Sequence, residues 1–324
     1  MKILIIGPNF FSYTKAISKE INRRHAQCFI FNEIHSNSVF VKIGYRLNLN
    51  FLFKEKIKLH RAKACSFIDD NQISDVLFIS PEDVSDDFLL EVKKRARVHL
   101  YMWDGFKNKK NALSVLRLFS TKSSFDMFDC KDYEMSYIPL FAEEEYRASD
   151  AKKLYDMSFC GTIHSDRPTW IGMLTKYAKE ENLRIGLLLY YYSPILLFIR
   201  LSVNKCCFDL FNKVSYNSFS KKNIARLFRE SKAVVDLTHP NQNGLTSRTF
   251  EALRSGSKLI TNNRNCKILE REYHSRIFIL ENVDTQKKEL SEFIESDIKP
   301  LDKKQDHFLS IERFTDQLLE NLND

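Results

Sequence analysis

Residues 244–261 read GLTSRTFEALRSGSKLIT and set out a glycine loop, a short helix, a glycine stop and an apolar strand. Thr246 or Ser247 can cap the helix, because a hydroxyl oxygen there accepts a hydrogen bond from a free backbone N–H group. Gly256 stands where a helix commonly ends in a left-handed residue, and residues 258–261 form the strand. Loop–helix–strand units of this kind present a helix N-terminus to phosphate and an acidic residue to a ribose. The stretch therefore predicts a nucleotide-binding α/β domain.

The short helix carries apolar and charged residues on different faces. It is expected to turn three apolar side chains toward the core, Phe250, Ala252 and Leu253. Arg248 and Glu251 lie near its beginning, where a cation can meet phosphate and an acid can meet a ribose. The alternative is an ordinary αβ unit with a surface ion pair between these two residues. The helix alone leaves both interpretations open.

The composition is that of a large globular chain. Its 324 residues suffice for two domains, with 44% hydrophobic and 28% charged residues. The net charge of +8, from 50 Lys and Arg against 42 Asp and Glu, suits diphosphate, nucleic acid or anionic lipid. The basic residues occur in short clusters without interleaved aromatic residues, so no nucleic-acid partner is expected. A weak attraction to an anionic bilayer is the better functional interpretation.

The cysteines and the apolar segments indicate the compartment. Seven cysteines, an odd number with no C-x-x-C pair, favour reduced thiols in a cytoplasmic protein over disulfides or a zinc site. The first residues, MKILIIG, read as a strand rather than a signal peptide. The apolar run 185–199 is shorter than the ~20 residues that span a bilayer. It predicts a buried strand and a buried helix opened by Pro194, and the alternative is a peripheral contact with the inner face of the membrane.

Strands and helices alternate along the whole chain. In the first half, strands are expected at residues 3–6, 28–31, 76–79, 98–102 and 137–139, and helices at 13–24, 54–69, 86–97 and 111–119. The polar residues 142–153 read as a domain linker. Beyond it, strands are expected at 157–160, 185–190, 233–237, 258–261 and 277–280, and helices at 169–180, 221–230, 248–254 and 310–322. Such alternation predicts two parallel sheets with helices on both faces.

Three stretches together resemble a known enzyme superfamily. Residues 250–261, FEALRSGSKLIT, are similar to the donor-site signature of GT-B glycosyltransferases of the group-1 kind. The longer string 236–263 resembles a branch found in bacterial capsule and lipopolysaccharide biosynthesis, and so do 124–141 (SFDMFDCKDYEMSYIPLF) and 155–168 (YDMSFCGTIHSDRP). The order and spacing of these stretches are specific for the superfamily but not for a sugar.

The resemblance implies an architecture. It implies two Rossmann-like domains that face each other across a cleft: an acceptor-side domain at residues 1–145 and a nucleotide-sugar domain at 154–306. A C-terminal helix at 307–324 is implied to pack back on the first domain. Enzymes of this kind hold the donor diphosphate with helix dipoles and basic side chains, so neither a metal ion nor a cofactor beyond the donor is expected.

The loops that follow the strands of the second domain supply the expected donor contacts. Gly161 permits close approach to the diphosphate and Thr162 can donate to it, while Arg167 brings a fork of donors to phosphate. For Arg167 the alternative is a surface ion pair with Asp166, and His164 is a proton carrier or plain loop. The resemblance implies that Tyr216 stacks on the base.

The signature stretch itself supplies the other donor contacts. The donor is expected to lie along four residues of the loop, Asn243, Gly244, Leu245 and Thr246. Arg248 can neutralise the leaving diphosphate. Glu251 corresponds to the second acid of the family's E-x7-E pattern, which holds the ribose hydroxyls. The first acid falls at position 243, where this chain has Asn243. This departure weakens the expectation for the sugar end of the donor and for retaining stereochemistry.

The first domain supplies the expected acceptor side. Gly7 and Asn9 follow the first strand, in a loop that faces the acceptor in enzymes of this kind; the alternative for Gly7 is a tight turn. Asp104 follows the strand at 98–102 and is the candidate general base that deprotonates the acceptor hydroxyl. The alternative for Asp104 is a helix cap. Asp126 and Asp129 read as a turn and a helix start.

Together these features predict a glycosyltransferase that moves a sugar from a nucleotide-sugar to a glycan, lipid-linked or free, of the bacterial surface. The alternative from another class is a non-catalytic GT-B-like binding or scaffold subunit, which the missing first acid favours. A nucleotide-sugar epimerase of the Rossmann kind would require a glycine fingerprint, which is absent, and a Tyr-x-x-x-Lys pair, for which Tyr216 and Lys221 have the wrong spacing.

Overall fold

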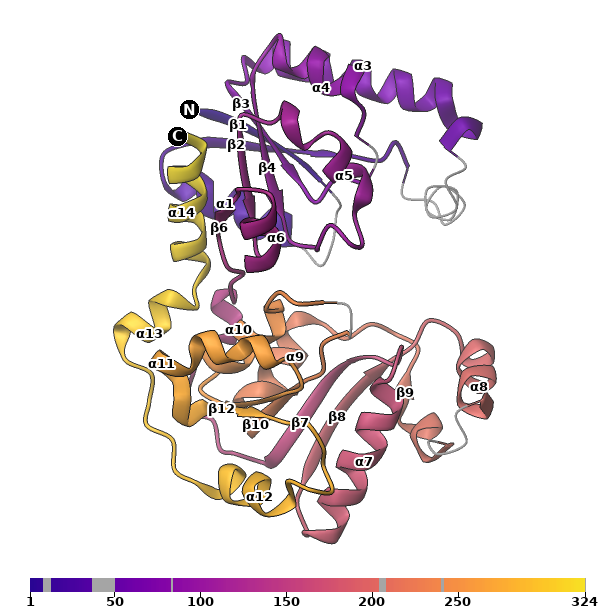
Figure 1. Cartoon of the computed structure of the whole chain (residues 1–324), viewed down its shortest axis with the longest axis vertical. Coiled ribbons are helices and arrows are strands. Elements are labelled where there is room, and N and C mark those ends of the chain that lie inside the picture. Colours follow the sequence, from indigo (N-terminus) through magenta and orange to yellow (C-terminus); the bar gives the residue numbers. More distant parts are fainter. Residues whose placement is uncertain (8–12, 37–49, 83, 204–207, 240–241, 324) are drawn as a thin grey trace. The chain divides into compact units, whose positions relative to one another are not determined.

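The computed structural model describes residues 1–324 apart from 8–12, 37–49, 83, 204–207, 240–241 and 324. The chain forms two compact units, each with its own sheet (Figure 1). The first unit comprises Met1–Pro139 and Ile311–Asp324, and the second comprises Leu140–Ser310. Within the described residues, no helix combines the length and the apolar character needed to cross a bilayer.

The first unit is built on a parallel sheet with the strand order β2-β1-β3-β4-β5-β6. Its strands are β1 (Lys2–Gly7), β2 (Gln27–Asn32), β3 (Asp75–Ile79), β4 (Arg97–Met102), β5 (Thr121–Ser124) and β6 (Ser136–Tyr137). The helices are α1 (Tyr13–Arg23), α3 (Lys54–Asn71), α4 (Asp86–Lys93), α5 (Lys110–Ser114), α6 (Met127–Asp132) and the C-terminal α14 (Ile311–Asn323). Because both faces of the central strands are covered, β3 is buried at every position.

The second unit is built on a parallel sheet with the order β12-β11-β10-β7-β8-β9. Its strands are β7 (Tyr155–Thr162), β8 (Ile185–Tyr190), β9 (Val214–Ser215), β10 (Ser231–Asp236), β11 (Lys258–Thr261) and β12 (Ile277–Ile279). The helices are α7 (Arg167–Glu180), α8 (Pro194–Val203), α9 (Lys221–Arg229), α10 (Ser247–Arg254), α11 (Glu270–Tyr273), α12 (Lys287–Glu295) and α13 (Lys303–Phe308). The predicted α/β class with two Rossmann-like parallel sheets is confirmed.

Several expected elements differ in the structure. The helix expected at 111–119 is only α5 followed by a short 3-10 turn at Leu116–Leu118. β5 was not expected, because its sequence TKSS is polar. Ser123 lies fully buried in β5 and its hydroxyl donates to the Leu100 carbonyl at 3.1 Å, which satisfies the polar group inside the sheet. The helix opened by Pro194 exists as α8, but its described side chains are mostly exposed rather than buried.

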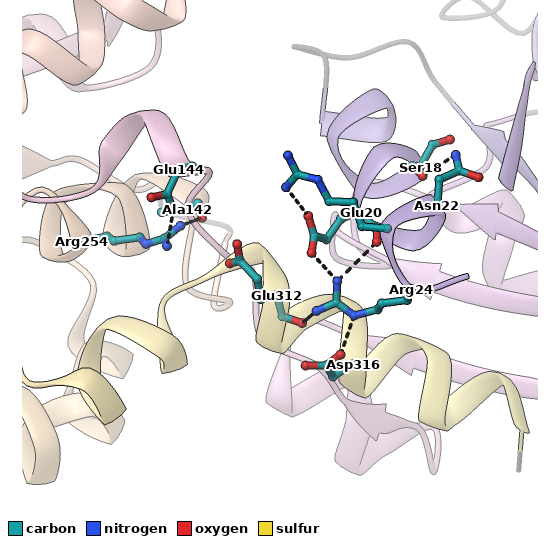
Figure 2. Close-up of polar contacts among 10 residues, drawn as sticks. Ser18, Glu20, Asn22, Arg24, Ala142, Glu144, Arg254, Glu312 and Asp316 are labelled. Atoms are coloured by element: carbon teal, nitrogen blue, oxygen red, sulfur yellow. Dashed lines mark hydrogen bonds and ion pairs between the residues drawn. The ribbon is translucent and has the colours of Figure 1, made fainter. Parts of the chain in front are cut away.

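The C-terminal helix α14 belongs to the first unit. Arg24, which directly follows α1, donates to Asp316 at 2.6 Å and to the Glu312 carbonyl at 2.9 Å (Figure 2). The Phe314 ring meets Tyr101 of β4 edge-on, with 5.1 Å between ring centroids. The 13 residues of α14 therefore complete the core of a unit whose other residues end at Pro139.

The start of the stretch 142–153, expected as a polar linker, is anchored inside the second unit. Ala142 is fully buried and pairs with Ser310 in a parallel bridge. The buried Arg254 donates to the Ala142 carbonyl at 2.8 Å and forms an ion pair with Glu144 at 2.8 Å (Figure 2). It also forms an ion pair with Asp306 at 3.3 Å. The division between the two units falls after Pro139 and before Ile311.

Candidate functional site

The N-terminus of α10 is fixed by a buried carboxylate. Thr246 caps the helix, since its hydroxyl accepts from the Thr249 N–H at 3.4 Å, while the same hydroxyl donates to Asp236 Oδ2 at 2.8 Å. The Thr249 hydroxyl donates to the same oxygen at 2.8 Å. Asp236 is the last residue of β10 and is buried. The sequence analysis missed Asp236, although an acid at a strand end followed by T-x-x-T was the available signal.

Asparagines that follow β11 hold the other side of this loop. Asn265 Nδ2 donates to the Asn243 carbonyl at 2.9 Å, and Asn263 Nδ2 donates to the Gly244 carbonyl at 3.3 Å. Asn262 Oδ1 accepts from the Thr238 N–H at 2.8 Å. The loop before α10 is thus held from β10 and β11 together. The first N–H groups of α10 have no partner within the helix, as at any helix N-terminus, and can donate to an anion.

α10 otherwise follows its sequence pattern. Phe250, Ala252 and Leu253 are fully buried, as predicted. Gly256 ends the helix at φ +74°, the left-handed conformation predicted for it. Leu245 is buried before the helix, so of the loop residues it offers only its backbone to a ligand.

Arg167 lies at the carboxyl ends of β7 and β10, where its guanidinium bonds only neutral groups. Its Nε and Nη2 donate to the Leu237 carbonyl at 3.1 and 2.9 Å, and its Nη1 donates to the Thr162 carbonyl at 3.3 Å. Within the described residues no carboxylate forms an ion pair with Arg167. The alternative for Arg167, an ion pair with Asp166, is not formed; Asp166 accepts from the Trp170 indole at 3.1 Å. Burial lowers the pKa of Arg167.

Gly161 and His164 both lie in contact with the Arg167 side chain or leave space for it. A Cβ on Gly161 would come within 2.9 Å of the Phe159 ring and 3.5 Å of the Arg167 guanidinium, so this position favours glycine. His164 Nε2 accepts from Arg167 Nη1 at 3.0 Å. Because arginine only donates, this contact requires a neutral imidazole with its proton on Nδ1.

Arg248 and Glu251 form an ion pair, but not a surface one. Arg248 Nη1 lies 3.0 Å from Glu251 Oε2, and the Glu251 side chain is only 2% exposed against 24% for Arg248. The Arg248 guanidinium also lies over the Phe228 ring, 5.1 Å from its centroid. Burial is the main cause that lowers the pKa of Arg167; the charge of Asp236 acts in the opposite direction, and the positive charge of Arg248 adds to the lowering. Arg167 and Arg248 therefore form a pair of cations near the N-terminus of α10, which we call the arginine pair.

Tyr216 lies farther along the same sheet. It follows β9, which is separated from β7 by β8, and its side chain is exposed. The preceding Ser215 hydroxyl accepts from the Asn217 N–H at 3.1 Å and donates to the Asn217 carbonyl at 2.8 Å, which fixes the turn. An exposed aromatic ring on a fixed turn can stack on a flat ligand.

The candidates in the first unit follow β1 and β4. A Cβ on Gly7 would lie 3.0 Å from the Ile79 carbonyl, so close strand packing rather than a turn demands glycine. Asn9 lies outside the described residues. The Asp104 N–H donates to the Ser80 hydroxyl at 3.2 Å, and Ser80 itself has φ +41° at the end of β3. Sequence reasoning missed Ser80, which joins the ends of β3 and β4.

Asp104 is a buried carboxylate that does not cap the helix after it. Burial raises the pKa of its carboxyl, and the charge of Lys109 acts in the opposite direction. The next helix, α5, begins after Lys109 and has no side-chain cap, which excludes the capping alternative for Asp104. Asp126 does cap α6, accepting from the Phe128 N–H at 2.9 Å, as the sequence indicated. No cluster of metal-ligating side chains occurs in the part of the chain that the structure describes.

Comparison with known proteins identifies the fold. No family model and no curated protein matches the sequence. The structure is similar to a glycosyltransferase from Rickettsia africae (TM-score 0.64, 12% identity, covering 99% of this chain and 97% of that one). It is also similar to the lipopolysaccharide outer core galactosyltransferase WaaB (TM-score 0.59, 12% identity, covering 100% and 98%). A third match is Anabaena HepE in complex with UDP-glucose (TM-score 0.63, 11% identity, covering 100% and 99%).

These likenesses extend over the full length of both chains and show that the protein has the GT-B fold, as the sequence resemblance implied. A UDP-GlcNAc 2-epimerase from Methanocaldococcus jannaschii shares the fold at a TM-score of 0.57 and 9% identity. The fold thus carries more than one chemistry on nucleotide sugars, so the residues of the site must decide the activity.

Proposed function

We propose that this protein is a glycosyltransferase that takes a sugar from a nucleotide-sugar donor. The observation that carries the proposal is the arginine pair. Arg167 forms no ion pair with a carboxylate among the described residues, and the charge of Arg248 repels it, while the charge of Asp236 acts in the opposite direction. Two like charges held close together at a helix N-terminus are stabilised by an anion with two or more charges, such as a diphosphate.

The arginine pair suits the departure of a nucleoside diphosphate. Negative charge grows on the leaving phosphate as the bond to the sugar breaks, so fixed cations lower the barrier more than they tighten substrate binding. Gly161, Thr162 and the backbone from Asn243 to Thr246 would border the phosphates. Tyr216 would stack on the base. Glu251 is proposed to hold the ribose, and through its ion pair it also orients Arg248.

The acceptor side of the proposal rests on Asp104. As general base it would take the proton of the acceptor hydroxyl while that oxygen attacks the anomeric carbon. A raised pKa makes the carboxylate a stronger base than an ordinary aspartate. Gly7 and Asn9 are proposed to border the acceptor. The proposal includes no metal ion and no cofactor besides the donor.

The biological setting follows from the capsule and lipopolysaccharide resemblance of residues 124–141, 155–168 and 236–263, and WaaB is a fold neighbour named for lipopolysaccharide. We propose that the acceptor is a growing surface glycan carried on a lipid. The enzyme would act in the cytoplasm at the inner face of the membrane.

The test is thermal stabilisation by a panel of UDP-, GDP-, TDP- and CMP-sugars. At least one should raise the melting temperature, since a ligand bound only by the folded state stabilises it. Glu251→Ala should weaken that stabilisation, and Arg248→Ala should depress turnover more than it harms folding. Stabilisation by none of the sugars would favour a scaffold subunit, whose support is Asn243 in place of an acid. Conversion of the free UDP-sugar without an acceptor would instead identify an epimerase.

A further inference from the structure

Nearly all of the net positive charge lies in one segment of the second unit. Residues 182–229 contain a single acid, Asp209, and eight basic residues: Arg184, Arg200, Lys205, Lys213, Lys221, Lys222, Arg226 and Arg229. This segment therefore carries seven of the eight net positive charges of the chain. The remaining residues are close to neutral. A charge asymmetry of this size indicates a negatively charged partner for this region.

The same segment contains an apolar helix with little cover. In α8 and the residue two positions before it, four large apolar side chains are exposed to solvent: Tyr192 (61%), Ile195 (72%), Leu196 (45%) and Phe198 (53%). We call these four residues the α8 surface. Leu197, by contrast, is fully buried. In Figure 1, α8 lies beside β9, the edge strand of the second sheet.

Basic residues adjoin the α8 surface. The Phe198 ring packs edge-on against Phe211 with 6.4 Å between centroids, which joins α8 to the 3-10 helix Phe208–Lys213. Lys213 ends that 3-10 helix, is exposed, and forms no ion pair with any residue that the structure describes. Other cations of the segment are neutralised, since Arg184 pairs with Asp156 and Lys221 pairs with Glu143. Among the described residues, Lys213 is thus an exposed cation on the 3-10 helix that packs against α8.

We propose that the α8 surface inserts into the interface of an anionic lipid bilayer. A helix of ten residues cannot span a bilayer, but exposed Phe, Ile, Leu and Tyr side chains can enter the boundary between headgroups and acyl chains. Lysines beside them are attracted to acidic headgroups. A second copy of the chain would bring two segments of strong positive charge together, which opposes a symmetric dimer through α8.

This membrane contact serves the proposed transferase by bringing it to a lipid-linked acceptor, but the contact itself is measured without donor or acceptor. The experiment is co-sedimentation with vesicles of phosphatidylcholine alone and of phosphatidylcholine mixed equally with phosphatidylglycerol. The protein should bind the mixed vesicles, bind the neutral ones far less, and be released by salt. The double variant Ile195→Ser/Phe198→Ser should lose at least about tenfold in the bound-to-free ratio.

Ile268→Ser is the matched control, because Ile268 is an exposed apolar residue of the same unit away from α8. It should bind vesicles like the unchanged protein. Thermal stabilisation of the double variant by the donor that stabilises the unchanged protein shows that the variant is folded. Equal vesicle binding by the double variant overturns the proposal. Light scattering gives a second outcome that overturns the proposal: the unsubstituted protein is a dimer and the double variant is a monomer. In that case α8 is a surface through which two copies of the chain associate. Failure of every donor to stabilise the protein refutes the transferase and leaves the vesicle result standing.

Discussion

At the scale of single residues, Arg167 is the most informative side chain of the second unit. Among the described residues, the partly buried Arg167 guanidinium bonds carbonyls and a neutral imidazole, so it has lost hydration without gaining a direct ion pair, and the Asp236 charge acts on it only without such a bond. Such a group is stabilised when an anion binds. The cation is therefore better explained by a ligand than by the stability of the unliganded fold.

Arg167→Lys keeps the charge but removes the planar fork of donors, so it should weaken donor binding by about 10- to 100-fold with little loss of stability. Calorimetric titration with the stabilising UDP- or other nucleotide-sugar measures this. Arg184→Lys is the control, because Arg184 bonds Asp156 at the opposite end of β8. Equal loss of affinity in both variants would assign the effect to general charge or packing.

Asp104 gives a second prediction at this scale. Asp104→Asn should lower turnover by about 10²-fold or more and leave donor binding unchanged, because the base acts on the acceptor. Asp132→Asn, an exposed acid in α6 of the same unit, should retain turnover.

The dependence of the transfer rate on pH should also reflect the raised pKa of Asp104. A base works only when deprotonated, so activity falls as the pH drops through its pKa, and burial moves that fall above the range of an ordinary aspartate. The pH profile of kcat/KM measures the position of the acid limb. A limb at about pH 4 would exclude Asp104 as the group that titrates.

At the scale of elements, the two ends of α10 have different roles: one end belongs to the candidate site and the other end fixes a neighbouring segment of the chain. At the N-terminus of α10, Asp236 accepts a hydrogen bond from the capping Thr246 and so fixes the end that is proposed to meet the ligand. Near the C-terminus, Arg254 donates to the Ala142 carbonyl and fixes the segment around Ala142. Arg254→Met should destabilise the protein by about 2–4 kcal/mol, because it removes a buried side chain and leaves the Ala142 carbonyl without its donor. Denaturant unfolding measures the change. Arg147→Met, which removes an exposed partner of Glu144 and Asp306, should cost less than about 1 kcal/mol. Similar losses for both variants would contradict the anchoring role of Arg254.

The sequence was sufficient to predict helices and strands that bury apolar side chains. The run at β8 and the apolar face of α10 could be predicted, because hydrophobic periodicity reports burial directly. β5 could not, since Ser123 is buried through a hydrogen bond rather than through an apolar side chain. The anchoring of Ala142 by Arg254 was equally hidden, because contacts between a buried arginine and residues more than a hundred positions away leave no local pattern.

The same limit applied to the site. Gly161, Arg167 and Arg248 could be named from their places after strands and at a helix start. Asp236 was missed although its strand-end position was a signal, and the asparagines could not be named, because their partners are backbone carbonyls of a loop about twenty residues earlier in the chain. Motifs identify the residues that face a ligand more readily than the residues that hold them in place.

At the scale of the whole molecule, the first unit is completed by the C-terminal helix α14, which follows the second unit in sequence. α14 contributes four buried apolar side chains to that unit, Ile311, Phe314, Leu318 and Leu322. Each contributes roughly 1.5–3 kcal/mol by leaving water. Arg313 also donates to the Pro139 carbonyl at 2.8 Å, where the first passage of the chain through this unit ends. The stability of the first unit therefore depends on residues that follow the whole second unit in sequence.

Truncation after Ser310 should consequently destabilise the first unit and spare the second. Hydrogen–deuterium exchange should accelerate in α1 and β4, which lose Arg24–Asp316 and Tyr101–Phe314, while β7, β10 and α10 keep their protection. Truncation after Leu322 is the matched control, because it removes only the last residue of α14 and Asp324. The shortened chain should still gain protection around Arg167 and α10 when the donor is added, since those residues lie wholly in the second unit. Faster exchange throughout the second unit would show instead that the two sheets unfold together.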